Sequence, residues 1–299
     1  MNTKAWIEAA RLRTLPLSVS GIILGTFYAI SHSIFNWKIV GFSLLTTLGL
    51  QILSNFANDY GDGVKGTDNK DRIGPPRAVQ SGTITAPQMK KGIIITAVLT
   101  FISALLLIYV SFGTRYLGYS VFFIVLGIIA IYAAIKYTVG KNAYGYKGMG
   151  DIFVFLFFGL VSVMGTYFLF VKQLDYLLLF PAAAIGFLSV GVLNLNNMRD
   201  VVSDEKYGKN TLVVKLGSEV AKNYHYFLVL MAMFLMVIFA ILNQFRIDQY
   251  LFVLAFVPLL NHIRIVYNNN EPRDLDPQLK TLALSTFLLT FLMSICLIF

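Results

Sequence analysis

Two acid-rich segments carry carboxylates and amides at a spacing that could hold a metal ion. The first reads NDYGDGVKGTDNKDRIGPPRAVQSG, where Asn58 and Asp62 are four residues apart and Asp59 lies between them. Residues three or four apart share one face of a helix, so these side chains face together if the preceding helix continues one more turn. Asp68 and Asp71 follow in a glycine-containing stretch that can fold back. Clustered carboxylates repel one another unless a cation neutralises them, so the segment predicts a cation site rather than a solvated loop.

The second segment reads NLNNMRDVVSDEKYGKNTLVVKLG and carries a polar stripe. Asn196, Asp200 and Asp204 step by four residues, so their oxygens lie on one face of a helix. The alternative is an ordinary helix cap followed by a solvated helix. Asn194 and Asn197 add amides close to an apolar segment, where unpaired polar groups are costly. This pattern therefore favours a second half of the same site.

The ligand types indicate magnesium. The three histidines, His32, His225 and His262, are far apart in the chain, and Cys296 is the single cysteine. Oxygen ligands without histidine or cysteine suit Mg²⁺ better than zinc. Mg²⁺ usually binds one or two carboxylates together with substrate phosphates. The predicted metal ligands are Asn58, Asp59, Asp62, Asp68, Asn196, Asp200 and Asp204.

Basic residues accompany the acids in both segments. A site with both signs of charge suits a diphosphate, whose oxygens bridge to the metal and pair directly with cations. The predicted diphosphate-binding residues are Lys65, Arg72, Arg77, Arg199 and Lys209. Tyr132 and Lys136, four residues apart at a helix end, form a further candidate pair that could reach the diphosphate. Lys136 could equally be a lysine whose chain extends to the membrane surface.

The elements that position these residues are membrane helices. Hydrophobic residues make up 57% of the chain and charged residues 13%, and the mean hydropathy is +0.71. Soluble domains carry about 25% charged residues, so the solvent around this chain is predicted to be lipid. A helix crosses a bilayer with about 20 apolar residues. Nine segments qualify: 15–34, 39–57, 92–112, 118–138, 151–171, 174–194, 224–243, 249–268 and 279–299.

These segments predict an all-α, polytopic membrane protein with one domain over residues 1–299 and about nine helices around a central cavity. Residues 4–13 are amphipathic and are expected to lie in the membrane interface. The two acid-rich segments form the long loops 58–91 and 195–223.

Charge placement predicts the orientation. Nine spans put all but four of the 24 Lys and Arg residues on one side, the exceptions being Lys38, Arg115, Lys172 and Arg246. The positive-inside rule then places the N-terminus and both long loops in the cytoplasm, with the chain in the plasma (inner) membrane. The net charge of +9 does not indicate nucleic-acid binding, because no basic stripe with interleaved aromatic residues occurs.

These motifs resemble those of the UbiA superfamily of intramembrane prenyltransferases, and specifically the branch that acts on 1,4-dihydroxy-2-naphthoate in menaquinone synthesis. Asn58 and Asp62 match the first two positions of that family's N-x-x-x-D-x-x-x-D pattern. Gly66 stands at the third position and Asp68 comes two residues later, as in the dihydroxynaphthoate branch. The second segment matches D-x-x-x-D-x-x-x-D with Asn196 in first place. Tyr132 and Lys136 match the family's Tyr-x-x-x-Lys.

The resemblance implies transfer of a polyprenyl group from polyprenyl diphosphate to 1,4-dihydroxy-2-naphthoate, with Mg²⁺ as cofactor. Diphosphate and CO₂ leave, and demethylmenaquinone forms. Asp62, Asp200, Tyr132 and Lys136 are the implied catalytic residues. The mechanism requires both acid clusters within roughly 10–12 Å of each other, because they share one small diphosphate.

Other functions stay open at this level. The acceptor could instead be 4-hydroxybenzoate, homogentisate, haem or chlorophyllide, as in other branches of the superfamily. CDP-alcohol phosphotransferases expect a D-G-x-x-A-R run, which this chain lacks. A secondary transporter would use acids within the membrane as ion-coupling sites, whereas these acids fall at the ends of spans.

Overall fold

The chain is helical throughout the part that the computed structural model describes, residues 3–69 and 73–299. No strand occurs within those residues. The first half contains α1 (Thr3–Ala10), α2 (Leu15–Ser31), α3 (Trp37–Lys65), α4 (Ala86–Phe112), α5 (Leu117–Lys136), α6 (Gly150–Val154), the π-helix η3 (Phe155–Gly165) and α7 (Thr166–Val171). The second half contains α8 (Leu179–Lys206), α9 (Leu212–Leu216), α10 (Ser218–Leu242), η5 (Ile247–Ala255), α11 (Phe256–Tyr267), η6 (Pro272–Leu275) and α12 (Asp276–Cys296).

The predicted membrane helices are present. Within the described residues, eight helical segments are long and apolar enough to cross a bilayer. The predicted first span corresponds to α2, which reaches that length only together with α1, and the two helices are bent by 54° to each other. The all-α fold with eight or nine candidate spans therefore agrees with the sequence prediction.

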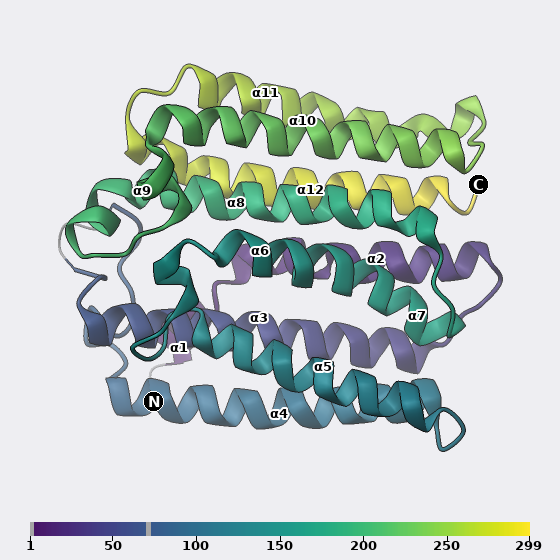
Figure 1. Ribbon diagram of the computed structural model, residues 1–299, viewed down its shortest axis with the longest axis horizontal. Helices are drawn as coiled ribbons and strands as arrows, with labels where there is room; N and C mark the ends of the chain where they lie inside the picture. The colour runs from purple at the N-terminus through teal and green to yellow at the C-terminus, as the bar shows by residue number, and fades with distance from the viewer. Residues whose placement is uncertain (1–2, 70–72) are drawn as a thin grey trace.

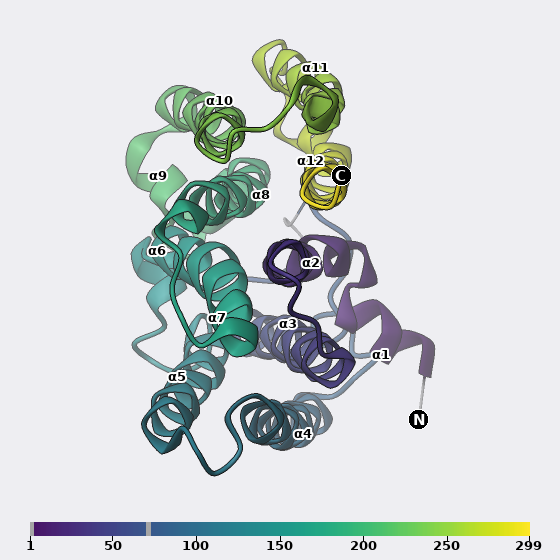
Figure 2. The same ribbon diagram turned by 90° about the vertical axis from the view of Figure 1, so that its right-hand side faces the viewer.

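The helices lie side by side in one bundle, and both long connections are at the same end (Figure 1). Viewed along the helices, α10 and α11 lie outside α8 and α12, while α4 and α5 lie at the opposite edge (Figure 2). The most apolar part of α8 is more than half buried. This helix, which carries the second acid segment, is thus an inner element of the bundle.

The two helices that carry the acid motifs extend further than the apolar segments predict. The second predicted span stops at residue 57, but α3 continues to Lys65, and α8 continues past residue 194 to Lys206. Four acids on these extra turns, Asp59, Asp62, Asp200 and Asp204, are buried in the protein. Gly66, with a φ of +75°, ends α3, because glycine adopts left-handed backbone conformations without steric cost. The long loops are consequently shorter than the predicted 58–91 and 195–223.

The segment η3 is an 11-residue π-helix within the fifth span, a conformation that is rare and often found at functional sites. It packs closely against α8. A Cβ atom at Gly159 would lie 2.6 Å from the Ala182 carbonyl oxygen and 2.7 Å from the Gly186 Cα. The two backbones can approach this closely only because Gly159 has no side chain.

Two hydrophobic clusters hold the bundle together. The larger cluster contains residues of α2, α7, α8, α10, α11 and α12. The smaller contains residues of α1, α3, α4 and the segment after α3. Each cluster contributes residues to the wall of one internal cavity: Leu107 belongs to the larger cluster, and Ala134 packs against the smaller. That cavity is where the acid segments meet.

Candidate active site

A cavity of about 370 Å³ extends from the end of the bundle that carries the long loops into its apolar interior. Its polar end is bordered by Asn58, Asp62, Thr67, Asp68, Arg77, Asn196, Asp200, Asp204, Lys209 and Lys280. Both acid segments therefore contribute to one cavity, as the spacing of their acids predicts.

The first segment places Asp62 at the centre of the polar end. The Tyr146 hydroxyl donates to Asp62 Oδ1 at 2.7 Å and lies 2.6 Å from the Thr67 hydroxyl. Asn58, one turn earlier on α3, borders the same cavity. Their common face follows from the continuation of α3 through the motif.

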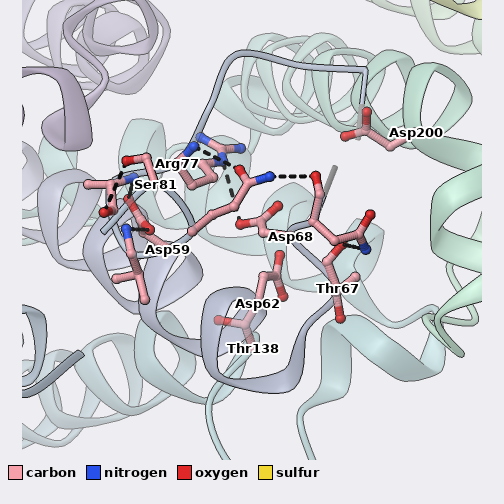
Figure 3. A network of polar contacts seen from close by, with 12 residues as sticks. Asp59, Asp62, Thr67, Asp68, Arg77, Ser81, Thr138 and Asp200 are labelled. Atoms are coloured by element: carbon pink, nitrogen blue, oxygen red, sulfur yellow. Dashed lines mark hydrogen bonds and ion pairs between the residues drawn. The ribbon is translucent and has the colours of Figure 1, made fainter. Parts of the chain in front are cut away.

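The loop after α3 folds back and brings Asp68 beside Asp62. The backbone N–H groups of Thr67 and Asp68 both donate to the Asp62 carbonyl oxygen, at 3.0 and 3.3 Å. Asp68 then borders the cavity and pairs with Arg77, whose Nε lies 3.8 Å from Asp68 Oδ2 (Figure 3). Because α3 ends at Gly66 and the chain reverses there, an acid two residues after the expected position reaches the site.

Asp59 lies on a different side of α3 from the cavity. Its carboxylate oxygens accept hydrogen bonds from the backbone N–H groups of Ala78 and Val79, each at 3.0 Å (Figure 3). It does not border the cavity. The spacing of three residues to Asp62 suggested a shared face, but the carboxylate instead attaches the returning loop to α3. This geometry gives Asp59 a structural part and does not bring it to the other predicted ligands.

The second segment lies along the cavity face of α8. Asn196, Asp200 and Asp204 all border the cavity, as their four-residue spacing predicts. Arg199 is 1% exposed and does not border the cavity. Its Nε and Nη2 donate to the two Asp200 oxygens at 2.9 and 2.6 Å, and Nη2 also donates to Asn196 Oδ1 at 2.9 Å. Arg199 thus holds the acid motif, whereas Arg77 and Lys209 border the cavity.

Lys209 connects the two segments. Its Nζ lies 3.3 Å from Asp62 Oδ2 and 3.7 Å from Asp204 Oδ1. These oxygens are therefore no farther apart than the sum of the two distances, which confirms the predicted convergence of α3 and α8. Burial alone would lower the pKa of Lys209, but the Asp62 and Asp204 carboxylates outweigh it and raise that pKa. The lysine is a permanent cation between the two acid motifs.

The remaining predicted cations have different positions. Lys65 Nζ donates to the Thr138 carbonyl oxygen at 2.8 Å and lies 3.8 Å from the centre of the Tyr146 ring. It does not border the cavity, so it supports the site from outside. Arg72 lies outside the described residues.

Tyr132 and Lys136 are not brought to the cavity. Tyr132 is 62% exposed, and Lys136 Nζ lies 5.9 Å from its ring centre. The same Tyr-x-x-x-Lys spacing recurs at Tyr137 and Lys141. Tyr137 does border the cavity, so the rotation of α5 favours this second tyrosine as the one that faces a substrate.

The described architecture matches known proteins. The model of the UbiA prenyltransferase family matches residues 18–288, nearly the whole chain. The chain belongs to the UbiA prenyltransferase family. It is 42% identical to a Haemophilus influenzae protein named 1,4-dihydroxy-2-naphthoate octaprenyltransferase, over 98% of this chain and 95% of that protein. It is 44% identical to the Escherichia coli protein of the same name, over 93% of this chain and 90% of that protein.

Solved structures share the fold of this UbiA family member. A UbiA homologue from Archaeoglobus fulgidus bound to DMAPP and Mg²⁺ has a TM-score of 0.62 at 16% identity, covering 95% of this chain and 99% of that one. A UbiA homologue from Aeropyrum pernix has a TM-score of 0.70 at 11% identity, covering 93% and 97%. At these identities the likeness concerns the fold.

Tyr146 is a further site residue of this UbiA family member that motif spacing did not identify. It lies in the connection before α6, within GYKGMGD, and its hydroxyl contacts Asp62. Burial raises the pKa of Tyr146, and the Asp62 carboxylate raises it further. The phenol therefore stays protonated and donates to the acid. Nothing in its spacing marks it, because a loop residue follows no helical period.

The interior of the cavity is apolar and rich in aromatic rings. Its wall includes Leu107, Ile108, Phe123, Leu126, Phe153, Phe157, Phe158, Val161 and Leu169. A lipid chain fits such a space, and the polar end fits its charged head. The aromatic faces can also stabilise a nearby cation.

The polar end offers oxygen donors of the kind that Mg²⁺ binds. Carboxylate and amide side chains border it, among them Asn58, Asp62, Asp68, Asn196, Asp200 and Asp204. Within the described residues, no three His, Cys, Asp or Glu side chains form a ready-made metal cage. That arrangement fits an ion that takes one or two carboxylates and completes its shell with phosphate oxygens and water.

Proposed function

We propose that this protein transfers a polyprenyl group from polyprenyl diphosphate to 1,4-dihydroxy-2-naphthoate, releasing diphosphate and CO₂ and forming the hydroquinone form of demethylmenaquinone. The observation that carries the proposal is the meeting of two acid motifs, through Lys209, at the polar end of an apolar cavity. The acceptor is supported by the names of the two bacterial relatives, which match nearly the whole chain. The unit that acts is the whole chain, because α2 and α12 both contribute to the cavity.

The polar end would bind the diphosphate together with Mg²⁺. Mg²⁺ held by the oxygens of Asn58, Asp62, Asp68, Asn196, Asp200 and Asp204 would supply a Lewis acid for the leaving group. Arg77 and Lys209 border the same space, so their cations can pair with phosphate oxygens. These residues stabilise negative charge where it develops as the allylic C–O bond breaks.

The apolar cavity has the complementary task. As the C–O bond breaks, its electron pair leaves with diphosphate, and the prenyl group becomes a carbocation that water would consume. Phe123, Phe157 and Phe158 line the apolar space that would surround the prenyl chain and keep water away from it. The carboxyl-bearing carbon of the naphthoate then forms the new C–C bond, and the bond to CO₂ breaks to restore the aromatic ring.

The polar end of the bundle is proposed to face the cytoplasm from the plasma (inner) membrane. The lysine and arginine asymmetry of the connections supports this orientation, with α1 on the same side. Both substrates can then meet in the cavity, the lipid from the membrane and the acceptor from the cytoplasm.

A direct assay tests the proposal. Purified protein is incubated with Mg²⁺, octaprenyl diphosphate and 1,4-dihydroxy-2-naphthoate, and the product is identified by mass. Parallel reactions contain EDTA, or 4-hydroxybenzoate or homogentisate as acceptor. We expect the mass of the demethylmenaquinone hydroquinone, or of the quinone that air oxidation makes from it, only with dihydroxynaphthoate and metal. Product with another acceptor alone would replace the proposed substrate, and undiminished turnover in EDTA would remove the metal–diphosphate site.

A further inference from the structure

The last helix reaches into the acid site through one buried arginine. The Arg199 side chain uses Nε and Nη2 for Asp200 and Asn196, as described above. Its remaining nitrogen, Nη1, donates to Asp276 Oδ1 at 2.5 Å. Asp276 is the first residue of α12, a helix whose sequence shows no acid motif. A carboxylate–guanidinium–carboxylate chain therefore joins α12 to the second motif.

The charges explain why a second carboxylate matters there. A guanidinium that binds both oxygens of Asp200 neutralises that acid and competes with any cation for it. Asp276 draws on the same guanidinium from the other end, which leaves Asp200 with more of its negative charge. Arg199 is fully buried, whereas the side chain of Asp276 is 32% exposed. The positive end of the α12 dipole further favours a carboxylate at this position.

The position of Asp276 is set by contacts that lie outside the cavity. In the same first turn of α12, Gln278 Oε1 lies 2.8 Å from His262 Nδ1, and His262 Nε2 lies 2.8 Å from His225 Nε2. These buried contacts fix α12 against α10 and α11. Lys280, about one helical turn after Asp276, borders the cavity. The start of α12 is thus held in a defined register beside the acid site.

We propose that Asp276 is a positioning residue for the metal–diphosphate site, acting through Arg199 on the orientation and charge of Asp200 and Asn196. The inference rests on the proposed function. It extends the site beyond both acid motifs to α12. Arg199 then acts as the link between Asp200 on α8 and Asp276 on α12.

The test compares Asp276→Asn with Asp274→Asn, an exposed aspartate two residues earlier that serves as matched control. Two readouts are measured: the Mg²⁺ dependence of turnover, and Mg²⁺-dependent binding of a non-reactive prenyl thiodiphosphate by calorimetry. Asp276→Asn keeps an oxygen acceptor but removes the negative charge, and weakening one charge-assisted hydrogen bond in this way corresponds to about a tenfold shift. We expect Asp276→Asn to need about tenfold more Mg²⁺ in both readouts, while kcat at saturating Mg²⁺ falls much less. The control should match the unmodified protein.

Two further variants separate positioning from general damage. In an Arg199→Gln background, Asp276→Asn should add no further shift, because its effect passes through that arginine. Asp276→Glu should shift the Mg²⁺ dependence less, in the same direction, and it serves as the test if Asp276→Asn fails to fold. Unchanged Mg²⁺ dependence in these variants, or full additivity with Arg199→Gln, would overturn the inference. The binding readout needs no acceptor, so it remains decisive even if dihydroxynaphthoate is not the substrate.

Discussion

Replacing Lys209 with methionine removes the cation between the two acid motifs while keeping most of the side-chain volume. The lysine contacts Asp62 and Asp204, and both acids are almost fully buried. At an effective dielectric constant near 20, each attraction is roughly 4.5–5 kcal/mol, and the desolvation of the three groups offsets a large part of both. Removing one partner of a buried charge pair costs about 3–5 kcal/mol. We expect Lys209→Met to lower the free energy of unfolding by that amount in metal-free buffer.

Magnesium should reverse part of this loss, because it supplies positive charge to the same carboxylates. The assay is unfolding of the detergent-solubilised protein, with and without Mg²⁺, for Lys209→Met, the unmodified protein and the exposed-site control Lys215→Met. We expect Mg²⁺ to narrow the stability gap by at least half. Turnover should still fall roughly 10²–10³-fold, the usual effect of removing one group that stabilises a leaving anion.

The pH dependence supplies a second check on the same variant. The pKa of Lys209 is raised above its ordinary value of 10.5, so its contribution to stability is fully present below 10.5 and is lost only as pH rises through the folded pKa. The gap between Lys209→Met and the unmodified protein should be flat from about pH 6 to about pH 9. A gap that ignores Mg²⁺, or one that closes within this pH range, would refute the placement of Lys209 as the charge between the motifs.

Three other substitutions test neighbouring parts of the site. Asp59→Ala should loosen the loop after α3, which we expect to lower the affinity for prenyl diphosphate and to speed proteolysis around residues 66–85. The Mg²⁺ concentration for half-maximal turnover should stay nearly unchanged. A large rise in that concentration would instead make Asp59 a metal ligand. Tyr146→Phe should reduce kcat about tenfold, since it removes a hydrogen bond to a charged group, whereas Tyr132→Phe should stay within twofold, and equal effects would contradict their different exposure. Gly159→Ala should lower the thermal midpoint by several degrees, because its Cβ would meet the α8 backbone; an unchanged midpoint would show that the helices can separate without cost.

Much of this architecture follows from elementary sequence features. Apolar length predicts the spans, and the four-residue steps through Asp62 and Asp200 predict that two distant helices carry one site. Both predictions depend on local periodicity, which survives into the folded state because every backbone group in a membrane helix must be paired. The convergence itself was predicted from chemistry, since one diphosphate needs both motifs.

Individual roles depend on rotations that a single sequence does not specify. Asp59 and Asp62 are both acids at helical spacing, yet one holds a loop and the other faces the cavity. Tyr132 and Tyr137 both precede a lysine by four residues, and only the turn of α5 separates the lipid-facing ring from the cavity-facing one. Tyr146 reaches the site through a loop that has no periodic signal. In each case, packing between elements decides the role.

The lysine between the motifs also bears on how such a protein is made. The segments containing Asp62 and Asp204 are made at different stages of synthesis, because three candidate membrane spans lie between α3 and α8 in the described part of the chain. Two clusters of acids brought together without a counter-charge would resist the last step of assembly. Lys209 arrives with the second cluster and contacts the first, so the chain carries its own counter-ion for closing the bundle. The bundle can thus close without a bound metal ion or lipid substrate, because Lys209 already balances part of the negative charge of the two acid clusters.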